Sequence, residues 1–169
     1  MENQSNGRFR IIRKESATPL HETDAMDTTG ITQIARAGFD RMAAAGMGDG
    51  STIKQVFAIP GMSVVHCWFK SGFPLPLHSH SADCFYYILA GDLQFGTETI
   101  GSGDGFFLPG GMPYAYTAGS QGVELLEIRT SDKFDMKCSI ENPAAWDKAV
   151  ELVAASRDRW LEERPPRRA

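Results

Sequence analysis

From Ile53 to Thr130 the chain alternates short runs of β-branched and aromatic residues with glycine, proline and aspartate. This texture is typical of an antiparallel β-barrel or sandwich, in which tight turns join short strands. Turns are expected at Pro60-Gly61, at Gly91-Asp92, and within 101–105 and 119–122. The expected strands are 53–59, 62–70, 76–80, 84–90, 92–97, 105–108, 114–118 and 123–130. The sequence therefore predicts an all-β domain over residues 51–138.

The segment before this domain, residues 1–50, is expected to form an N-terminal arm. Within it, Phe9–Ile12 is the stretch that resembles a strand able to pair with a sheet edge. The spacing of apolar residues from Ile31 to Met47 predicts a short helix, which Gly38 weakens.

The segment after the domain, residues 139–169, predicts a C-terminal helix. Asn142 is suited to cap this helix and Pro143 to occupy its first position. Apolar residues recur along it from Trp146 onward, so the helix should pack on the outside of the barrel or against a second subunit. Pro165-Pro166 should end it, and Arg167-Arg168 should form a frayed basic end.

The composition restricts the expected partners. A formal net charge of −4 argues against nucleic acid or an anionic membrane as the main partner. The polar start resembles no secretory leader, and no apolar run is long enough to cross a bilayer. Three widely spaced cysteines, Cys67, Cys84 and Cys138, do not make a disulfide framework. We expect a cytoplasmic domain that binds a small molecule.

Two histidines follow a proline-rich turn, with one residue between them. In an extended strand residues i and i+2 face the same way, so His78 and His80 share a face. Paired imidazoles are good ligands for transition metal ions. Cys84 has the same parity and is a candidate third ligand if the strand stays regular, although most free cysteines are buried small hydrophobes.

These residues resemble the first motif of the cupin superfamily, with Gly72, His78, His80, Cys84 and Gly91 at its spacing. A second cupin-like motif spans 103–114. The chain departs from the usual pattern at two metal-ligand positions, with Cys84 in place of glutamate and Tyr114 in place of histidine. The resemblance implies a jelly-roll antiparallel β-barrel, a homodimer and one divalent metal ion held by His78 and His80, with the Cys84 thiolate as the candidate third ligand.

Two tyrosines are candidate catalytic residues. Tyr86 has the parity of Cys84, and Tyr114 stands where the family has its second-motif histidine. Metal-dependent cupin lyases are similar in placing a tyrosine at the position of Tyr86. A phenol beside a cation can act as ligand, acid or base, whereas a strand tyrosine is usually a core residue with a satisfied hydroxyl.

Further polar residues lie on the flanking strands. His66 is expected to be a hydrogen-bonded core histidine, with replacement of the missing third histidine as the alternative. Glu124, Glu127 and Arg129 are expected to form exposed cross-strand pairs, with one acid lining the cavity as the alternative.

The resemblance and the residues together leave three functions open. The leading hypothesis is a mononuclear metal-dependent dioxygenase acting on a small organic or aromatic substrate, with Fe(II) favoured over Zn, Cu, Ni or Mn. The second is a metal-dependent lyase, isomerase or cyclase with a tyrosine base. The third is a ligand-binding cupin that has lost its metal, which the two replaced ligand positions favour.

Overall fold

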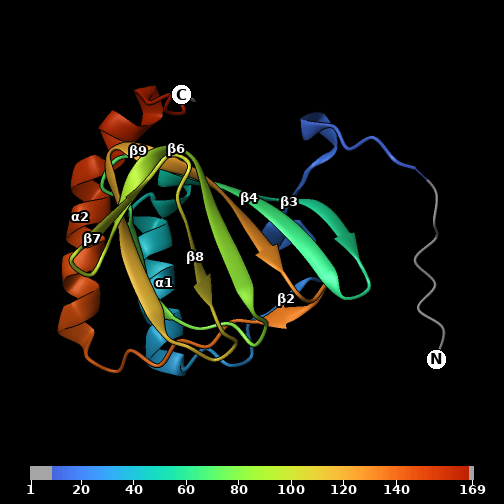
Figure 1. The fold of residues 1–169 in the computed structure, drawn as a ribbon. Coiled ribbons are helices and arrows are strands. Elements are labelled where there is room, and N and C mark those ends of the chain that lie inside the picture. The colour runs from blue at the N-terminus through green and yellow to red at the C-terminus, as the bar shows by residue number, and fades with distance from the viewer. Residues whose placement is uncertain (1–8, 168–169) are drawn as a thin grey trace.

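The computed structural model describes residues 9–167 and shows the predicted antiparallel β fold with a C-terminal helix (Figure 1). Two predicted features lie partly outside the described residues: the N-terminal arm at residues 1–8 and the basic end at Arg168. The main strands are β3 (Ser51–Ile59), β4 (Met62–Phe69), β5 (Pro74–His78), β6 (Cys84–Phe95), β7 (Glu98–Gly101), β8 (Gly105–Leu108) and β9 (Tyr114–Arg129).

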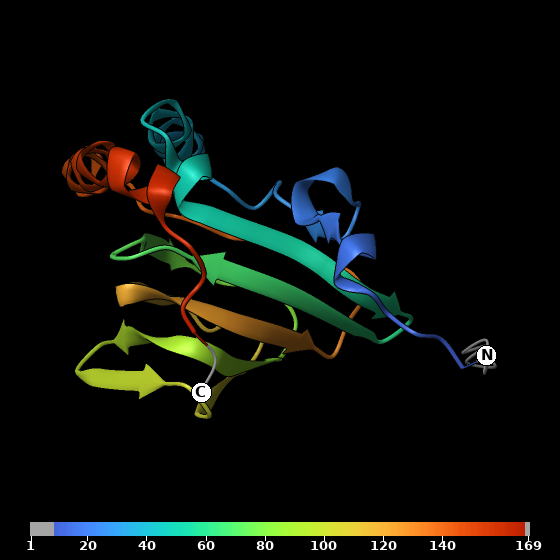
Figure 2. The same ribbon diagram turned by 90° about the horizontal axis from the view of Figure 1, so that it is seen from above.

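The sheet runs in the order β1-β3-β4-β9-β6-β7, where β1 is the short strand Thr18–Pro19. Figure 2 shows β3, β4, β9 and β6 in succession across this sheet. In addition, β5 pairs with the first half of β9, and β8 pairs with the first half of β6. Because β6 and β9 each pair with different partners along their lengths, the sheet curls around a common interior.

The predicted breaks at Gly91 and at 119–122 do not end strands. The predicted strands 84–90 and 92–97 are one continuous strand, β6, and 114–118 and 123–130 are one continuous strand, β9. Gly91 and Gly122 have positive φ angles of 72° and 74°. A Cβ at Gly91 would overlap the carbonyl oxygen of Gly122. These glycines allow β6 and β9 to approach and shift register, which is the role of a bulge rather than of a turn.

Both predicted helices are present, and they pack against each other at one side of the sheet (Figure 1). Helix α1 (Gln33–Ala44) begins at Thr32, whose hydroxyl accepts a hydrogen bond from the Ala35 amide at 3.3 Å. Helix α2 (Pro143–Glu162) begins at Asn142, whose side chain accepts one from the Ala144 amide at 3.0 Å. Among residues 9–167 no helix has the length and hydropathy that a membrane span requires.

The glycine that weakens α1 is required for this packing. Gly38 is buried under the Trp146 indole of α2, and a Cβ at Gly38 would overlap the ring. Farther along α2, the Trp160 indole donates a hydrogen bond to the Ser71 carbonyl at 2.9 Å and lies 5.6 Å from the Phe73 ring. The C-terminal helix is thus anchored to α1 near its start and to the barrel near its end.

The prediction of a strand at Phe9–Ile12 is wrong. This stretch has no strand pairing, and the Phe9 residue is 90% exposed. The sheet edge is instead occupied by β1, where Thr18 pairs with Gln55. After β1 the chain continues to the short strand β2 (Met26–Asp27). This strand pairs in parallel with β10 (Phe134–Asp135). The N-terminal segment therefore contributes to the wall of the barrel interior, because side chains at 20–31 line it.

Candidate functional site

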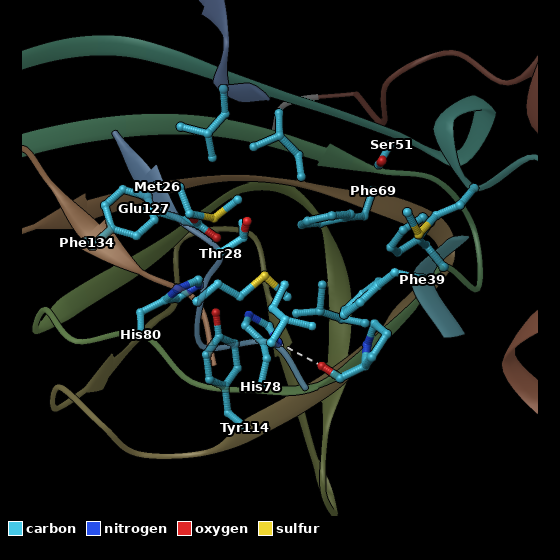
Figure 3. A pocket seen from close by; sticks show the side chains of 18 of the residues that line it. Met26, Thr28, Phe39, Ser51, Phe69, His78, His80, Tyr114, Glu127 and Phe134 are labelled. Carbon is cyan, nitrogen blue, oxygen red and sulfur yellow. Dashed lines mark hydrogen bonds between the residues drawn. The ribbon is translucent and has the colours of Figure 1, made fainter. Parts of the chain in front are cut away.

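A cavity of about 310 Å³ lies between the sheet, α1 and the N-terminal segment (Figure 3). Most of its wall is apolar and comes from segments far apart in the sequence. Its apolar residues include Leu20, Met26, Phe39, Phe69, Phe73 and Phe134. Such a chamber suits a small organic molecule, because an apolar wall binds a carbon skeleton and a few polar groups then fix its orientation.

Five polar side chains gather at one end of the cavity. They are His78 at the end of β5, His80 just beyond it, Tyr114 and Glu127 on β9, and Arg129 at the end of β9. Thr28, Arg36, Asp40 and Ser51 also line the cavity. The His78 and His80 rings have centroids 4.8 Å apart, and the Tyr114 ring lies 4.4 Å from that of His78. The strand alternation that placed the two histidines on one face is thus consistent with their positions in the cavity (Figure 3).

Backbone carbonyls orient both imidazoles. His78 Nδ1 lies 2.7 Å from the Pro76 carbonyl oxygen, and His80 Nδ1 lies 2.7 Å from that of Asp135. Since a carbonyl only accepts, each Nδ1 donates, and each Nε2 of the neutral ring keeps a free lone pair. Burial lowers the pKa of His78, and burial together with the Arg129 charge lowers the pKa of His80 to about 4. Both rings are therefore neutral at neutral pH.

Cys84 is buried, but it does not line the cavity. Its thiol contacts the Phe85 carbonyl at 3.8 Å, and burial raises its pKa to about 12. Over residues 9–167 no group of three histidine, cysteine or acidic side chains is placed to hold a metal ion. The structure therefore brings His78 and His80 together without Cys84 as a third ligand.

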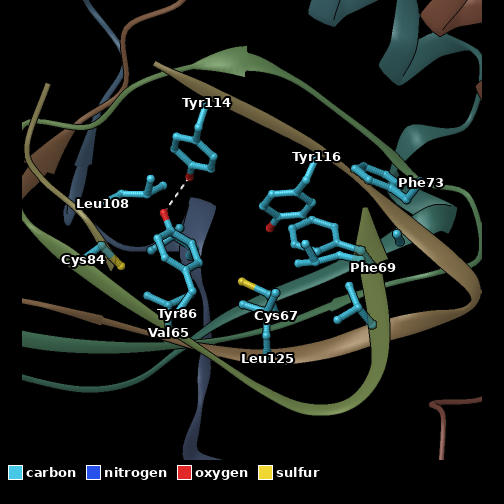
Figure 4. Close-up of a cluster of buried hydrophobic side chains, with 14 of the residues drawn as sticks. Val65, Cys67, Phe69, Phe73, Cys84, Tyr86, Leu108, Tyr114, Tyr116 and Leu125 are labelled. Atoms are coloured by element: carbon cyan, nitrogen blue, oxygen red, sulfur yellow. Dashed lines mark hydrogen bonds between the residues drawn. The ribbon is translucent and has the colours of Figure 1, made fainter. Parts of the chain in front are cut away.

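The two predicted tyrosines are hydrogen-bonded to each other, hydroxyl to hydroxyl, at 2.6 Å (Figure 4). Tyr114 lines the cavity, whereas Tyr86 lies behind it and stacks on Phe106 with centroids 4.5 Å apart. Burial, reinforced by the Glu127 charge, raises the pKa of both phenols well above the ordinary value. Both are protonated at neutral pH, which suits a hydrogen-bond or proton donor better than a base.

The expectation of exposed cross-strand pairs on β9 is wrong for Glu127 and Arg129, and the alternative of one acid lining the cavity is consistent with Glu127. The side chains of Glu127 and Arg129 are 8% and 1% exposed, and Glu127 Oε2 accepts a hydrogen bond from Arg129 Nη2 at 2.6 Å. The guanidinium also lies 4.0 Å from the centroid of the Phe134 ring. Strand parity could have revealed this, because Val123 and Leu125 point inward and positions 127 and 129 continue their face.

Glu127 is ionised in this setting. Burial favours its neutral form, but the charge of Arg129 and the hydrogen bond that it donates oppose burial, and the pKa of Glu127 lies below its ordinary value. His66, by contrast, lies outside the cavity, where its Nε2 is 2.8 Å from Glu124 Oε1. The prediction that His66 is a hydrogen-bonded structural residue is consistent with this contact, although its side chain is 26% exposed.

The lowered pKa of His80 predicts a loss of stability in mild acid. The unfolded chain takes up a proton as the pH falls through about 6.5, whereas folded His80 does so only near pH 4. Stability is therefore complete above pH 7 and falls as the pH drops, by about 2 kcal/mol between pH 7 and 5 from His80 alone. Urea unfolding of the chelator-treated protein at both pH values measures this change. If the His80→Gln variant lost as much stability between pH 7 and pH 5 as the unsubstituted protein, the prediction would be contradicted.

No protein-family model and no curated protein matches this chain. Solved structures that resemble it include KdgF from a Halomonas species, 21% identical, covering 48% of this chain and 81% of KdgF with a TM-score of 0.44. An RmlC-like cupin from Shewanella frigidimarina is 19% identical and covers 50% of this chain and 78% of its own, with a TM-score of 0.45. A variant of oxalate decarboxylase from Bacillus subtilis is 21% identical and covers 49% of this chain but 26% of its own, with a TM-score of 0.45.

Proposed function

We propose that this chain is a small-molecule metalloenzyme in which His78 and His80 hold a divalent transition metal ion at the polar end of the cavity. The observation that carries the proposal is the orientation of both rings. Each Nδ1 faces a backbone carbonyl at 2.7 Å, so each Nε2 is the nitrogen left for a metal. Ligating histidines in metal sites are typically fixed in this way by a partner on the other ring nitrogen.

The two imidazoles fit a metal ion in protonation state as well, because the lowered pKa values keep them neutral. Cys84 does not enter the proposal, since its thiol is protonated and outside the cavity. A pair of imidazole ligands suits iron, copper, nickel or zinc rather than magnesium or calcium. When bound, such an ion would supply an electrophilic centre that polarises a substrate or activates dioxygen.

The chain's own groups around the pair define what else the site can do. The Tyr114 hydroxyl, held by Tyr86 at 2.6 Å, is a protonated donor at the cavity surface. The apolar wall excludes water and holds the carbon skeleton of a substrate against this donor. Glu127 is paired with Arg129 at 2.6 Å, so the two together add no net charge to the polar end.

Among reaction classes, we place an oxygen-dependent reaction ahead of a lyase or isomerase with a tyrosine base. The raised pKa values of Tyr86 and Tyr114 count against a tyrosinate at neutral pH. Turnover of any substrate that is later identified distinguishes the two, because a dioxygenase stops in the absence of oxygen and a lyase does not.

A metal-free binding protein is the second candidate. It is favoured by one observation, the lack of a group of three metal-binding side chains within the described chain. Sites with two protein ligands bind more weakly than the usual sets of three or four.

Reconstitution tests the proposal. Chelator-treated protein is incubated anaerobically with Fe(II), Mn(II), Ni(II), Cu(II) or Zn(II), each in a separate sample, desalted and analysed for metal. We expect about one ion per chain for at least one metal, as a mononuclear site requires. Retention of none of these metals would overturn the metalloenzyme and leave the metal-free binding protein.

A further inference from the structure

Arg129 has hydrogen-bond donors that nothing in residues 9–167 accepts. Its Nη2 donates to Glu127 at 2.6 Å, but Nε and Nη1 are buried and have no hydrogen-bond partner within the described chain. The side chain is 1% exposed and lines the cavity. Buried guanidinium groups are normally hydrogen-bonded throughout, so the remaining donors favour an acceptor supplied by a ligand.

The charges at this end of the cavity admit one more anion. The Glu127 and Arg129 charges cancel, and the hydroxyls of Tyr86 and Tyr114 are hydrogen-bonded to each other at 2.6 Å. An incoming monoanion thus meets no net negative charge beside the guanidinium. A dianion such as phosphate is less suited, since Glu127 already occupies part of the single positive group.

The rest of the cavity is small and mostly apolar. Phe39 and Phe69 line it away from Arg129, Arg36 and Asp40 of α1 add one charge of each sign, and the volume of about 310 Å³ is at the lower end for ligand pockets. A ligand that complements both the Arg129 end and the apolar wall has a single acidic group and a compact carbon skeleton.

We propose that the cavity binds a small organic monocarboxylate, with the carboxylate on the Arg129 guanidinium and the apolar body against the opposite wall. A charge-assisted bond between guanidinium and carboxylate is stronger than a bond between neutral groups, and its planar geometry is specific. As a substrate class this rests on the proposed metalloenzyme, but binding of the acid itself requires no metal.

The test uses chelator-treated protein and three matched pairs of probes: phenylacetate and phenylacetamide, benzoate and benzamide, hexanoate and hexanamide. Within each pair the shape is similar and the charge differs. Isothermal titration calorimetry is expected to show that at least one acid binds roughly tenfold more tightly than its amide, in line with the greater strength of charged hydrogen bonds. Equal binding within every pair, or no binding of any acid, would overturn the inference.

Removing Arg129 alone leaves Glu127 buried without its partner, so the variant of choice is the double substitution Glu127→Gln with Arg129→Gln. Circular dichroism verifies that it is folded. The preference for acid over amide should fall to about one in this variant, whereas a retained preference would place the carboxylate elsewhere.

This design separates the two proposals. A protein that retains no metal but still prefers the acids sustains the carboxylate site and removes the metalloenzyme. A protein that retains metal but does not distinguish acid from amide removes the carboxylate site alone.

Discussion

Substitution of Glu127 by Gln is expected to lower the free energy of unfolding by about 3 kcal/mol or more, because it leaves the Arg129 charge buried without a counter-charge. The Arg129 side chain is 1% exposed and pairs with Glu127 at 2.6 Å. The guanidinium also lies over the face of the Phe134 ring, but a cation–π contact is weaker than the ion pair. Urea unfolding at pH 7 measures the loss.

The double substitution of Glu127 and Arg129 by Gln is the matched control. It removes both charges, so at least half of the lost stability should return, as is usual when a buried pair is replaced rather than broken. A cost below about 1 kcal/mol for Glu127→Gln alone would show that water solvates the guanidinium and that the pair is not a buried one.

Each of the substitutions His78→Ala and His80→Ala is expected to lower metal affinity by about 100-fold or more, since loss of only the hydrogen-bond partner of a ligating histidine already costs about 10- to 100-fold. His78 Nδ1 contacts the carbonyl of nearby Pro76 and His80 Nδ1 that of distant Asp135, so each substitution removes one side-chain hydrogen bond and no strand pairing. Competition with a chelating dye measures affinity, and thermal unfolding verifies the fold.

His66→Ala is the control for these two variants, because His66 bonds Glu124 and does not line the cavity. It should retain the affinity of the unsubstituted protein. If His66→Ala lost as much affinity as the other two variants, the metal would not be bound at the cavity pair.

The sequence predicted that His78 and His80 lie together, because residues i and i+2 of an extended segment face the same way. This rule depends only on the local backbone. Tyr114 lies beside His78 for another reason, because the two residues are paired across β5 and β9. The capping residues Thr32 and Asn142 likewise act within one turn of helix, so both helices could be anticipated.

The missed features depend on contacts between distant segments. Gly91 looks like a turn residue, and only its approach to Gly122 across two strands shows that it belongs within a strand. In the sequence Glu127 and Arg129 look like surface charges. Only their pairing in the interior offsets the free-energy cost of removing both charges from water. The N-terminal segment closes the cavity through the pairing of Met26 with Phe134, residues that are distant in sequence.

The most direct test of the metal site is the X-ray absorption spectrum of the protein loaded with Co(II), which reports the atoms bound to the ion. Our account predicts imidazole nitrogens from His78 and His80 and no sulfur neighbour, because the Cys84 thiol lies outside the cavity and burial raises its pKa to about 12. A sulfur neighbour would place Cys84 in the site, and a spectrum without two imidazoles would contradict the site altogether.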